Sequence, residues 1–435
     1  MVRGVKVASR APGWQFSPMR DERLRVFINE RPVDVAPGAT VRDAVAALDR
    51  GLSDLLAAAT AYVTDGVGRV VDGADPVGEA GAVFRVVVTA GRGPPLLSKE
   101  TLRRWPKAEL HVHLDGSLRP ATMLELARER GIRLPADTPD ALARALALTN
   151  ARGLEDYLAK YEMTLSVMQT AAALERIAYE FVLDVAAENV RYVEARYSPL
   201  LHHPAMSLRD AIEAPLRGFA RGSAETGTRV GLIVCAIRTQ PPARSVDLAE
   251  AAAEYRGAGI VGFDLAGAER GHPAEAHRAA FALAMRYGLA CTCHAGEGDG
   301  PHSIHQALHV CGAQRIGHGT RLSEDPALLA YVIERRIPLE MCLTSNLHTR
   351  TVASASAHPL RQYLEQGVVV TLNTDGRLVD GVSLTDEYHL AHTALGLSRD
   401  DLARLVLNAC ENAFLPEFER VALVARIQSE LEKVE

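Results

Sequence analysis

Two histidines separated by one residue are the sharpest chemical feature of this sequence. His111 and His113 lie in the segment AELHVH, which has the composition of a buried β-strand. Residues i and i+2 of a strand point to the same face, so both imidazoles would project into one space. Two neutral imidazoles form half of a site for a borderline divalent ion, most often zinc. The pair alone is a weak signal, and a metal site needs further ligands.

Two more candidate ligands stand at the ends of later strand-like segments. His294 ends LACTCHA, and Asp375 ends VVVTLNTD. Taken singly, each has an ordinary explanation, as a packed core histidine and as a helix N-cap. Together, three histidines and one aspartate leave a coordination position for water, which is typical of a catalytic zinc rather than a structural one. We therefore expect one Zn²⁺ per chain.

Two further groups suit proton transfer beside such an ion. Glu297 follows His294 by three residues, and a partly buried carboxyl there would have a raised pKa. His318, in the segment RIGHG, could take the proton of the metal's water or orient the hydroxide. The structural alternatives are a surface ion pair and a packed histidine. With Asp375, these residues are the expected catalytic groups.

The elements expected around these residues alternate between strand and helix. Eight apolar strand-like segments lie between residue 96 and residue 435, and most are followed by a stretch of helical periodicity such as AALERIAYEFVLDVAAEN. This pattern predicts an α/β protein, a (β/α)8 TIM barrel over residues 96–435. An open doubly wound sheet is the alternative, but it would need a glycine-rich phosphate turn, which the sequence lacks.

Polar residues at the ends of these segments agree with a barrel, because the active sites of such barrels lie at the carboxyl ends of the strands. We expect these side chains to gather at one rim. Besides the residues already named, they are Glu194, Arg196, Arg238, Asp264, Thr344 and Ser345.

The first part of the chain has a different texture. Residues 22–92 contain short strand-like segments around one helix, ATVRDAVAALDRGL, with Thr40 as its expected N-cap and Asp43 three residues on. The segment Asn29-Glu30-Arg31-Pro32 is an expected hairpin turn. The arrangement resembles a small α+β module of the ubiquitin-like β-grasp type. We expect it to dock a partner or to mediate homo-oligomerisation, and we expect residues 1–21 to form a flexible tail.

Composition excludes several classes of protein. The 435 residues are 48% hydrophobic and 23% charged with a net charge of −6, which is typical of a globular chain and favours neither nucleic acid nor a membrane surface as partner. No apolar run approaches the ~20 residues of a membrane-spanning helix, and the N-terminal segment lacks the apolar core of a secretory signal. Six cysteines, mostly in apolar runs, indicate reduced thiols in a cytoplasmic protein.

Six segments are spread over about residues 100–420: WPKAELHVHLDGSLRP, YVEARYSP, GFDLAGAE, HAGE, RIGHG and TLNTD. In this order they closely resemble the adenosine deaminase family of amidohydrolase-type barrels. The resemblance implies zinc-dependent hydrolytic deamination of an adenosine-like purine nucleoside, with release of ammonia. It implies zinc held by His111, His113, His294 and Asp375, and Glu297 as the protonated carboxyl that donates to the purine N1.

The same resemblance implies substrate contacts. Asp115 would lie near the sugar hydroxyls, Gly267 would contact the ring through its backbone, and Ser345 would lie near the metal. Three residues match the helix that covers the base in this family. Apolar side chains at helical spacing are equally well explained as part of an ordinary hydrophobic core. They are Tyr157, Leu158 and Tyr161.

One position departs from the family pattern. Family members end the last strand with two aspartates, the second of which hydrogen-bonds the purine N7, whereas here Asp375 is followed by Gly376 and Arg377. Losing a buried hydrogen-bond partner costs ~1–3 kcal/mol. The substrate is therefore an adenosine-like nucleoside or, alternatively, a modified or secondary-metabolite adenine nucleoside or nucleotide. Arg377 is either a solvated loop residue or a partner for a phosphate or carboxylate on such a substrate.

Two rival functions remain open. A barrel hydrolase acting on an amide or an N-alkyl amine is disfavoured by Glu297 and the DLAG segment. A catalytically impaired nucleoside-binding regulatory protein is supported only by Gly376.

Overall fold

The structure is a computed structural model that describes residues 23–57, 61–66, 70–88, 97–147, 153–202 and 204–434. The chain divides into two compact units, Met1–Pro95 and Leu96–Glu435, and each is described by itself. The expected tail at residues 1–21 lies outside the described residues.

The first unit is a five-stranded mixed sheet with two helices. The strand order is β2-β1-β5-β3-β4, and β1 and β5 pair in parallel at its centre while the other pairs are antiparallel. Valines and Phe84 from the sheet pack against Val41 and Val45 of α1 to form a separate apolar core. The elements are β1 (Leu24–Ile28), β2 (Arg31–Val35), α1 (Val41–Leu48), α2 (Arg50–Ala57), β3 (Ala61–Asp65), β4 (Val70–Val71) and β5 (Val83–Val88).

The hairpin turn of this unit is shorter than expected. Only Asn29 and Glu30 form it, with φ values of 49° and 67° that match a two-residue turn of type I′. Arg31 and Pro32 belong to β2, where a proline is tolerated because β2 is an edge strand. The prediction that Arg31 and Pro32 belong to the turn is therefore wrong.

The expected single helix is two helices. The capping box of Thr40 and Asp43 is present at the start of α1, as expected. Asp49 then adopts an extended conformation, and its carboxylate accepts from the N–H of Gly51 (2.8 Å), which ends α1 and begins α2.

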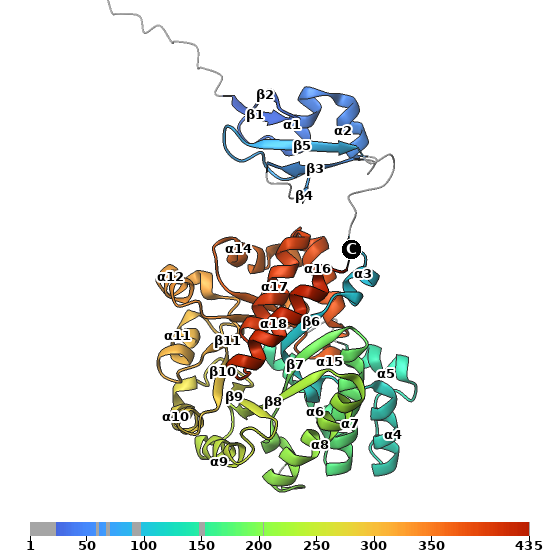
Figure 1. The fold of residues 1–435 in the computed structure, drawn as a ribbon, viewed down its shortest axis with the longest axis vertical. Helices are drawn as coiled ribbons and strands as arrows, with labels where there is room; N and C mark the ends of the chain where they lie inside the picture. Colours follow the sequence, from blue (N-terminus) through green and yellow to red (C-terminus); the bar gives the residue numbers. More distant parts are fainter. Residues whose placement is uncertain are drawn as a thin grey trace, which may run out of the picture. The chain divides into compact units, whose positions relative to one another are not determined.

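Eight parallel strands in chain order form the sheet of the second unit (Figure 1). The sheet closes where Asp375 meets the first strand. The N–H of Asp375 donates to the carbonyl of His111 (3.1 Å), and its carbonyl accepts from the N–H of His113 (2.7 Å). This closure confirms the expected (β/α)8 barrel. The strands are β6 (Lys107–His113), β7 (Val190–Tyr197), β8 (Arg229–Ile237), β9 (Ile260–Ala266), β10 (Ala290–Ala295), β11 (Arg315–His318), β12 (Leu339–Met341) and β13 (Val370–Leu372).

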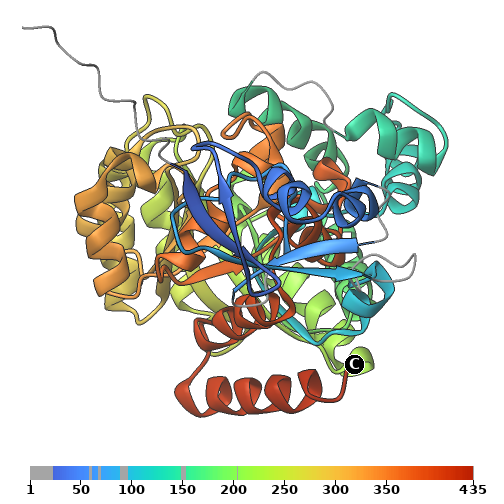
Figure 2. The same cartoon turned by 90° about the horizontal axis from the view of Figure 1, so that it is seen from above.

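Helices surround this sheet, and α18 lies along the outside of the barrel next to the C-terminus (Figure 2). Serine–aspartate capping boxes begin α16 and α17. The helices are α3 (Lys99–Arg104), α4 (Pro120–Arg130), α5 (Pro139–Leu146), α6 (Leu154–Val167), α7 (Ala171–Ala186), α8 (Leu208–Thr226), α9 (Pro242–Ala253), α10 (Arg278–Arg286), α11 (Pro301–His309), α12 (Pro326–Glu334), α13 (Leu343–His348), α14 (Leu360–Glu365), α15 (Arg377–Asp380), α16 (Leu384–Leu395), α17 (Arg399–Glu411) and α18 (Glu417–Leu431).

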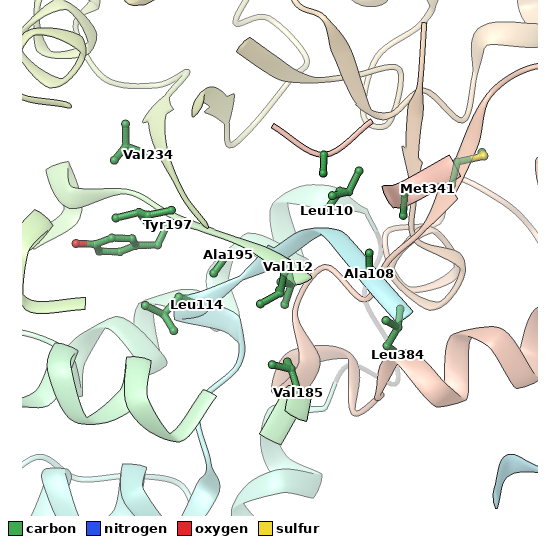
Figure 3. Close-up of a cluster of buried hydrophobic side chains, with 14 of the residues drawn as sticks. Ala108, Leu110, Val112, Leu114, Val185, Ala195, Tyr197, Val234, Met341 and Leu384 are labelled. Atoms are coloured by element: carbon green, nitrogen blue, oxygen red, sulfur yellow. The ribbon is translucent and has the colours of Figure 1, made fainter. Parts of the chain in front are cut away.

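The main core is the apolar layer between the strands and these helices. Figure 3 shows a part of it, in which Ala108, Leu110 and Val112 of β6 lie among residues of α7 and α16. Packing of this layer fixes the direction and register of β6, and thereby the positions of the two histidines at its end. Within the described part of the chain, no helix is both long and apolar enough to cross a membrane.

Candidate active site

Five side chains converge where the strands end at one mouth of the barrel. His111 and His113 come from β6, His294 from β10 and His318 from β11, and Asp375 follows β13. The Nε2 atom of His113 lies 3.1 Å from Nε2 of His294 and 3.3 Å from Oδ1 of Asp375. The Nε2 atom of His111 lies 3.5 Å from Oδ1 of Asp375. Tetrahedral ligands at ~2.0–2.1 Å from a zinc ion are about 3.3 Å apart. These spacings therefore suit a single ion.

His318 belongs to the same cluster. One ligand atom from each of His111, His294, His318 and Asp375 lies within 4.8 Å of the other three. The expected ligand set contained His113 instead of His318, and the structure brings both imidazoles to the cluster. Among the described residues, Nε2 of His111 and Nε2 of His318 are buried and have no hydrogen-bond partner. A buried polar nitrogen without a partner costs free energy, which a cation would relieve at Nε2 of His111 and an oxygen atom at Nε2 of His318.

Carboxylates beneath the cluster orient two of the imidazoles. The Nδ1 atom of His111 lies 2.9 Å from Glu340 Oε2, and Nδ1 of His294 lies 3.0 Å from Asp264 Oδ2. Arg196 donates to both carboxylates, at 3.0 Å to Asp264 and 2.8 Å to Glu340. An ionised carboxylate only accepts hydrogen bonds, so each Nδ1 carries the proton and each Nε2 presents a lone pair to the cluster.

These buried charges are part of a larger network inside the barrel. Arg315 donates to Glu340 (2.6 Å) and to Glu194 (2.5 Å). Burial alone would raise the pKa of Glu340, but Arg196 and Arg315 hold that pKa well below its usual range. Glu194, Arg196 and Asp264 were expected at the rim, yet they are fully buried inside, because strand alternation directs them inward. Glu340 was not expected, although a glutamate within the apolar segment IPLEMC is a signal for it.

A loop after β10 brings Glu297 to the cluster, with Oε2 at 3.5 Å from Nε2 of His318. One carboxylate, that of Glu269, holds this loop by accepting from four consecutive backbone N–H groups, residues 296–299, at 2.7–3.0 Å. Burial, followed by the negative charges of Asp375 and Glu269, raises the pKa of Glu297 well above its usual range. The protonated form of the Glu297 carboxyl is therefore favoured. Glu269 was not singled out from the sequence, although it is the last residue of the segment GFDLAGAE.

Helix α6 covers the cluster. The hydroxyl of Tyr157 lies 2.9 Å from Asp380 Oδ2 and 3.2 Å from Asp375 Oδ2, and the hydroxyl of Tyr161 lies 3.2 Å from that of Tyr157. Leu158 packs with these tyrosines in a small apolar cluster. Asp380 was missed by the sequence reasoning. Burial raises the pKa of Asp380 to about 6.

The glycine at position 376 makes room for these tyrosines. A Cβ atom on Gly376 would lie 2.5 Å from the Tyr161 hydroxyl and 3.0 Å from the Tyr157 hydroxyl. A Cβ atom on Gly116 would lie 2.7 Å from the same Tyr161 oxygen. The φ of Gly376 is −110°, so its backbone does not require glycine. The space that a side chain at 376 would fill is therefore taken by the hydroxyl groups of α6.

Other expected contact residues lie at the same rim. Ser345 donates a hydrogen bond to Asp375 Oδ2 (2.7 Å). Asp115 lies beside His113, with 3.7 Å between Oδ1 and Nδ1, and the same oxygen is buried without a hydrogen-bond partner among the described residues. Gly267 directly follows β9 with a φ of 98°, a conformation that favours glycine.

Arg377 is not brought to the cluster. Its guanidinium pairs with Glu188, lies 3.7 Å from Glu109, and lines a separate cavity of about 790 Å³ together with Arg119 and Glu188. None of the five cluster residues lines that cavity. The side chain is only 12% exposed, so it is a buried ion-pair partner and not a solvated loop residue.

Residues 106–430 match the sequence profile of the adenosine deaminase family. An adenosine deaminase of Mycobacterium tuberculosis is 40% identical over 345 residues, which cover 75% of this chain and 94% of that protein. A probable adenosine deaminase of Dictyostelium discoideum is 37% identical over 321 residues, 73% of this chain and 42% of that protein.

Two solved structures share the barrel. An amidohydrolase of Burkholderia ambifaria with bound Zn is 25% identical, with a TM-score of 0.71 and coverage of 79% of this chain and 95% of that one. The Arabidopsis N6-mAMP deaminase is 29% identical, with a TM-score of 0.67 and coverage of 76% and 99%. Because the family profile and these relatives match the chain, and because the barrel holds the histidine–aspartate cluster, the chain belongs to the adenosine deaminase family. It is an aminohydrolase that deaminates a purine.

Proposed function

We propose that this protein is a zinc-dependent deaminase of an adenosine-like purine nucleoside, which it converts to the inosine type with release of ammonia. The observation that carries the proposal is the convergence of imidazole nitrogens and one carboxylate beside Glu297, a buried carboxyl whose pKa is raised. Ring deamination needs both features, an activated water and a proton for the ring nitrogen.

His111, His113, His294 and Asp375 would hold the ion. Their donor set of three nitrogens and one oxygen suits zinc, and the lone pairs of His111 and His294 are already oriented by Glu340 and Asp264. A bound Zn²⁺ supplies a water that loses its proton near neutral pH.

The residues of the chain then divide the proton transfers. Glu297 protonates the ring nitrogen next to the carbon that carries the amine, so negative charge does not accumulate in the ring during attack of hydroxide. His318 and Asp375 flank the attacking oxygen, and Asp375 accepts its proton. Burial of all three groups strengthens these interactions, because little water competes with them. The proton held by Asp375 would then pass to the amine and the hydroxyl of the tetrahedral carbon would return a proton to Glu297, so that the carbon–nitrogen bond breaks and ammonia leaves.

An uncharged nucleoside fits the charges around the site better than a nucleotide does. Arg377, the group considered for binding a phosphate, is committed to Glu188 and faces away from the cluster. Asp115 near the site adds negative charge, which disfavours an anionic sugar substituent. A nucleotide or modified nucleoside is the second candidate, supported by the similarity to the Arabidopsis N6-mAMP deaminase. The ubiquitin-like character of residues 22–92, their docking or oligomerisation role and a cytoplasmic location stay predictions.

Removal of the metal is expected to abolish ammonia release from adenosine. Protein dialysed against a chelator should be inactive, and one equivalent of Zn²⁺ should restore activity, because three imidazoles and a carboxylate hold one ion. His294→Ala should lose the metal, whereas His309→Ala, an exposed histidine of α11, should retain it. Metal analysis and an ammonia assay measure both. Full activity of the metal-free protein would contradict the proposal.

The alkaline limb of the pH–rate profile is expected to report Glu297. Its raised pKa keeps the carboxyl protonated at neutral pH, and the proton is lost as pH rises through that pKa, so kcat falls on the alkaline side. The groups that face it are His318, Asp375 and Glu269. Glu297→Gln should lower kcat on the order of 10²–10⁴-fold and remove this limb. An unchanged limb in the variant assigns it to another group.

Glu269→Gln is expected to lower kcat at least about tenfold with unchanged metal content. The new amide group would face backbone N–H donors that the carboxylate now satisfies, so the loop carrying Glu297 would lose its fixed position. Glu275→Gln, on the exposed surface, is the matched control. Equal kcat in both variants would show that Glu269 does not position the acid.

Gly376→Asp is expected to lower kcat/KM for adenosine by about tenfold or more, because its Cβ would displace the Tyr161 hydroxyl at 2.5 Å. The double variant with Tyr161→Phe should recover part of the loss. Steady-state kinetics of the three proteins test this. A kcat/KM of Gly376→Asp above that of the wild-type protein would contradict this steric argument and would mean that the site accommodates a carboxyl at position 376.

A further inference from the structure

A chain of buried hydrogen bonds leads from a backbone amide to His318. The N–H of Leu360 donates to Nδ1 of His358 (3.1 Å), so this nitrogen is an acceptor. Burial lowers the pKa of His358 to about 3, so the ring is neutral and its one proton lies on Nε2. That Nε2–H group donates to Oδ1 of Asn346 (3.1 Å).

The amide of Asn346 is thereby fixed in one orientation. Its Oδ1 also accepts from the hydroxyl of Thr320 (2.9 Å), so the oxygen faces two donors. The Nδ2 atom must then face the remaining neighbour, Nδ1 of His318, at 3.1 Å. An amide nitrogen can only donate, so Nδ1 of His318 accepts and the ring proton lies on Nε2. Asn346, His358 and His318 are all buried.

This proton position is the reverse of that in His111 and His294. Those rings donate from Nδ1 to carboxylates and offer a lone pair at Nε2. His318 offers an N–H group at Nε2, which lies 3.5 Å from Glu297 Oε2 and 4.0 Å from Asp375 Oδ2. Both distances leave the N–H group available to an oxygen atom that approaches the cluster.

We propose that Asn346, supported by His358 and Thr320, is a positioning residue that keeps the proton of His318 on Nε2. His318 then donates a hydrogen bond to the attacking oxygen and neither binds the metal nor removes a proton. His113 takes the third histidine position of the ligand set, and Asp375 is the proton acceptor. The identity of the oxygen rests on the proposed function, whereas the proton position does not.

Asn346→Asp tests this with little change of shape. A carboxylate still accepts from His358 and Thr320, but it has no N–H to offer, so it accepts from Nδ1–H of His318 and moves the ring proton to that atom. The ¹⁵N NMR spectrum of zinc-loaded, histidine-labelled protein measures the tautomer, and His318→Gln identifies the His318 signals. Asn408→Asp, in which the replaced amide donates to a backbone carbonyl of β13, is the matched control.

We expect Nε2–H of His318 in the wild-type protein and Nδ1–H in Asn346→Asp. We expect kcat to fall on the order of 10²–10⁴-fold with little change in KM, and Asn408→Asp to keep its kcat. Asn346→Ala, which removes the donor without inverting the tautomer, should fall between, and it replaces the aspartate variant if that does not fold. An Nδ1–H tautomer in the wild-type protein, or equal kcat in Asn346→Asp, overturns the proposal. If the tautomers are as expected but no nucleoside releases ammonia, the proposed function is overturned and the proton position of His318 stands.

Discussion

The closure of the barrel between its first and last strands is the constraint on which the site depends. Asp375 makes the closing hydrogen bonds with the two residues whose side chains it must meet, His111 and His113. The ligands are more than 260 positions apart in sequence, yet their backbones are bonded neighbours. Asp375 adopts a φ of 62°, a conformation that costs an aspartate about 1 kcal/mol or more. The closing bonds and the surrounding core hold it there.

The interior below the cluster is polar, unlike the apolar filling common in such barrels. Arg196 and Arg315 form ion pairs with Asp264, Glu340 and Glu194, and these pairs are buried. Burying charges is costly unless each is paired and hydrogen-bonded. Here the pairing has a second consequence, because two of the carboxylates fix the tautomers of the metal-facing histidines. The network therefore prepares the site for a cation before one binds.

Local patterns were sufficient for the strands of the barrel and for the histidines and the aspartate at the strand ends, but not for the break between α1 and α2. Strand alternation placed His111 and His113 on one face, and the strand ends located His294, His318 and Asp375. Contacts between segments that are distant in sequence could not be predicted from local patterns. Glu269, Glu340 and Asn346 act through partners on other strands or loops, so their roles depend on register and loop path. Arg377 shows the same limit, because its direction is set by Glu188 on a separate helix end.

The proposed site requires side chains from three strands of the barrel to hold one ion. Anomalous diffraction from zinc-soaked crystals, recorded above and below the zinc edge, tests it most directly. We expect one peak at ~2.0–2.2 Å from Nε2 of His111, His113 and His294 and from a carboxylate oxygen of Asp375. Absence of a peak at this mouth, with those side chains directed apart, would contradict it.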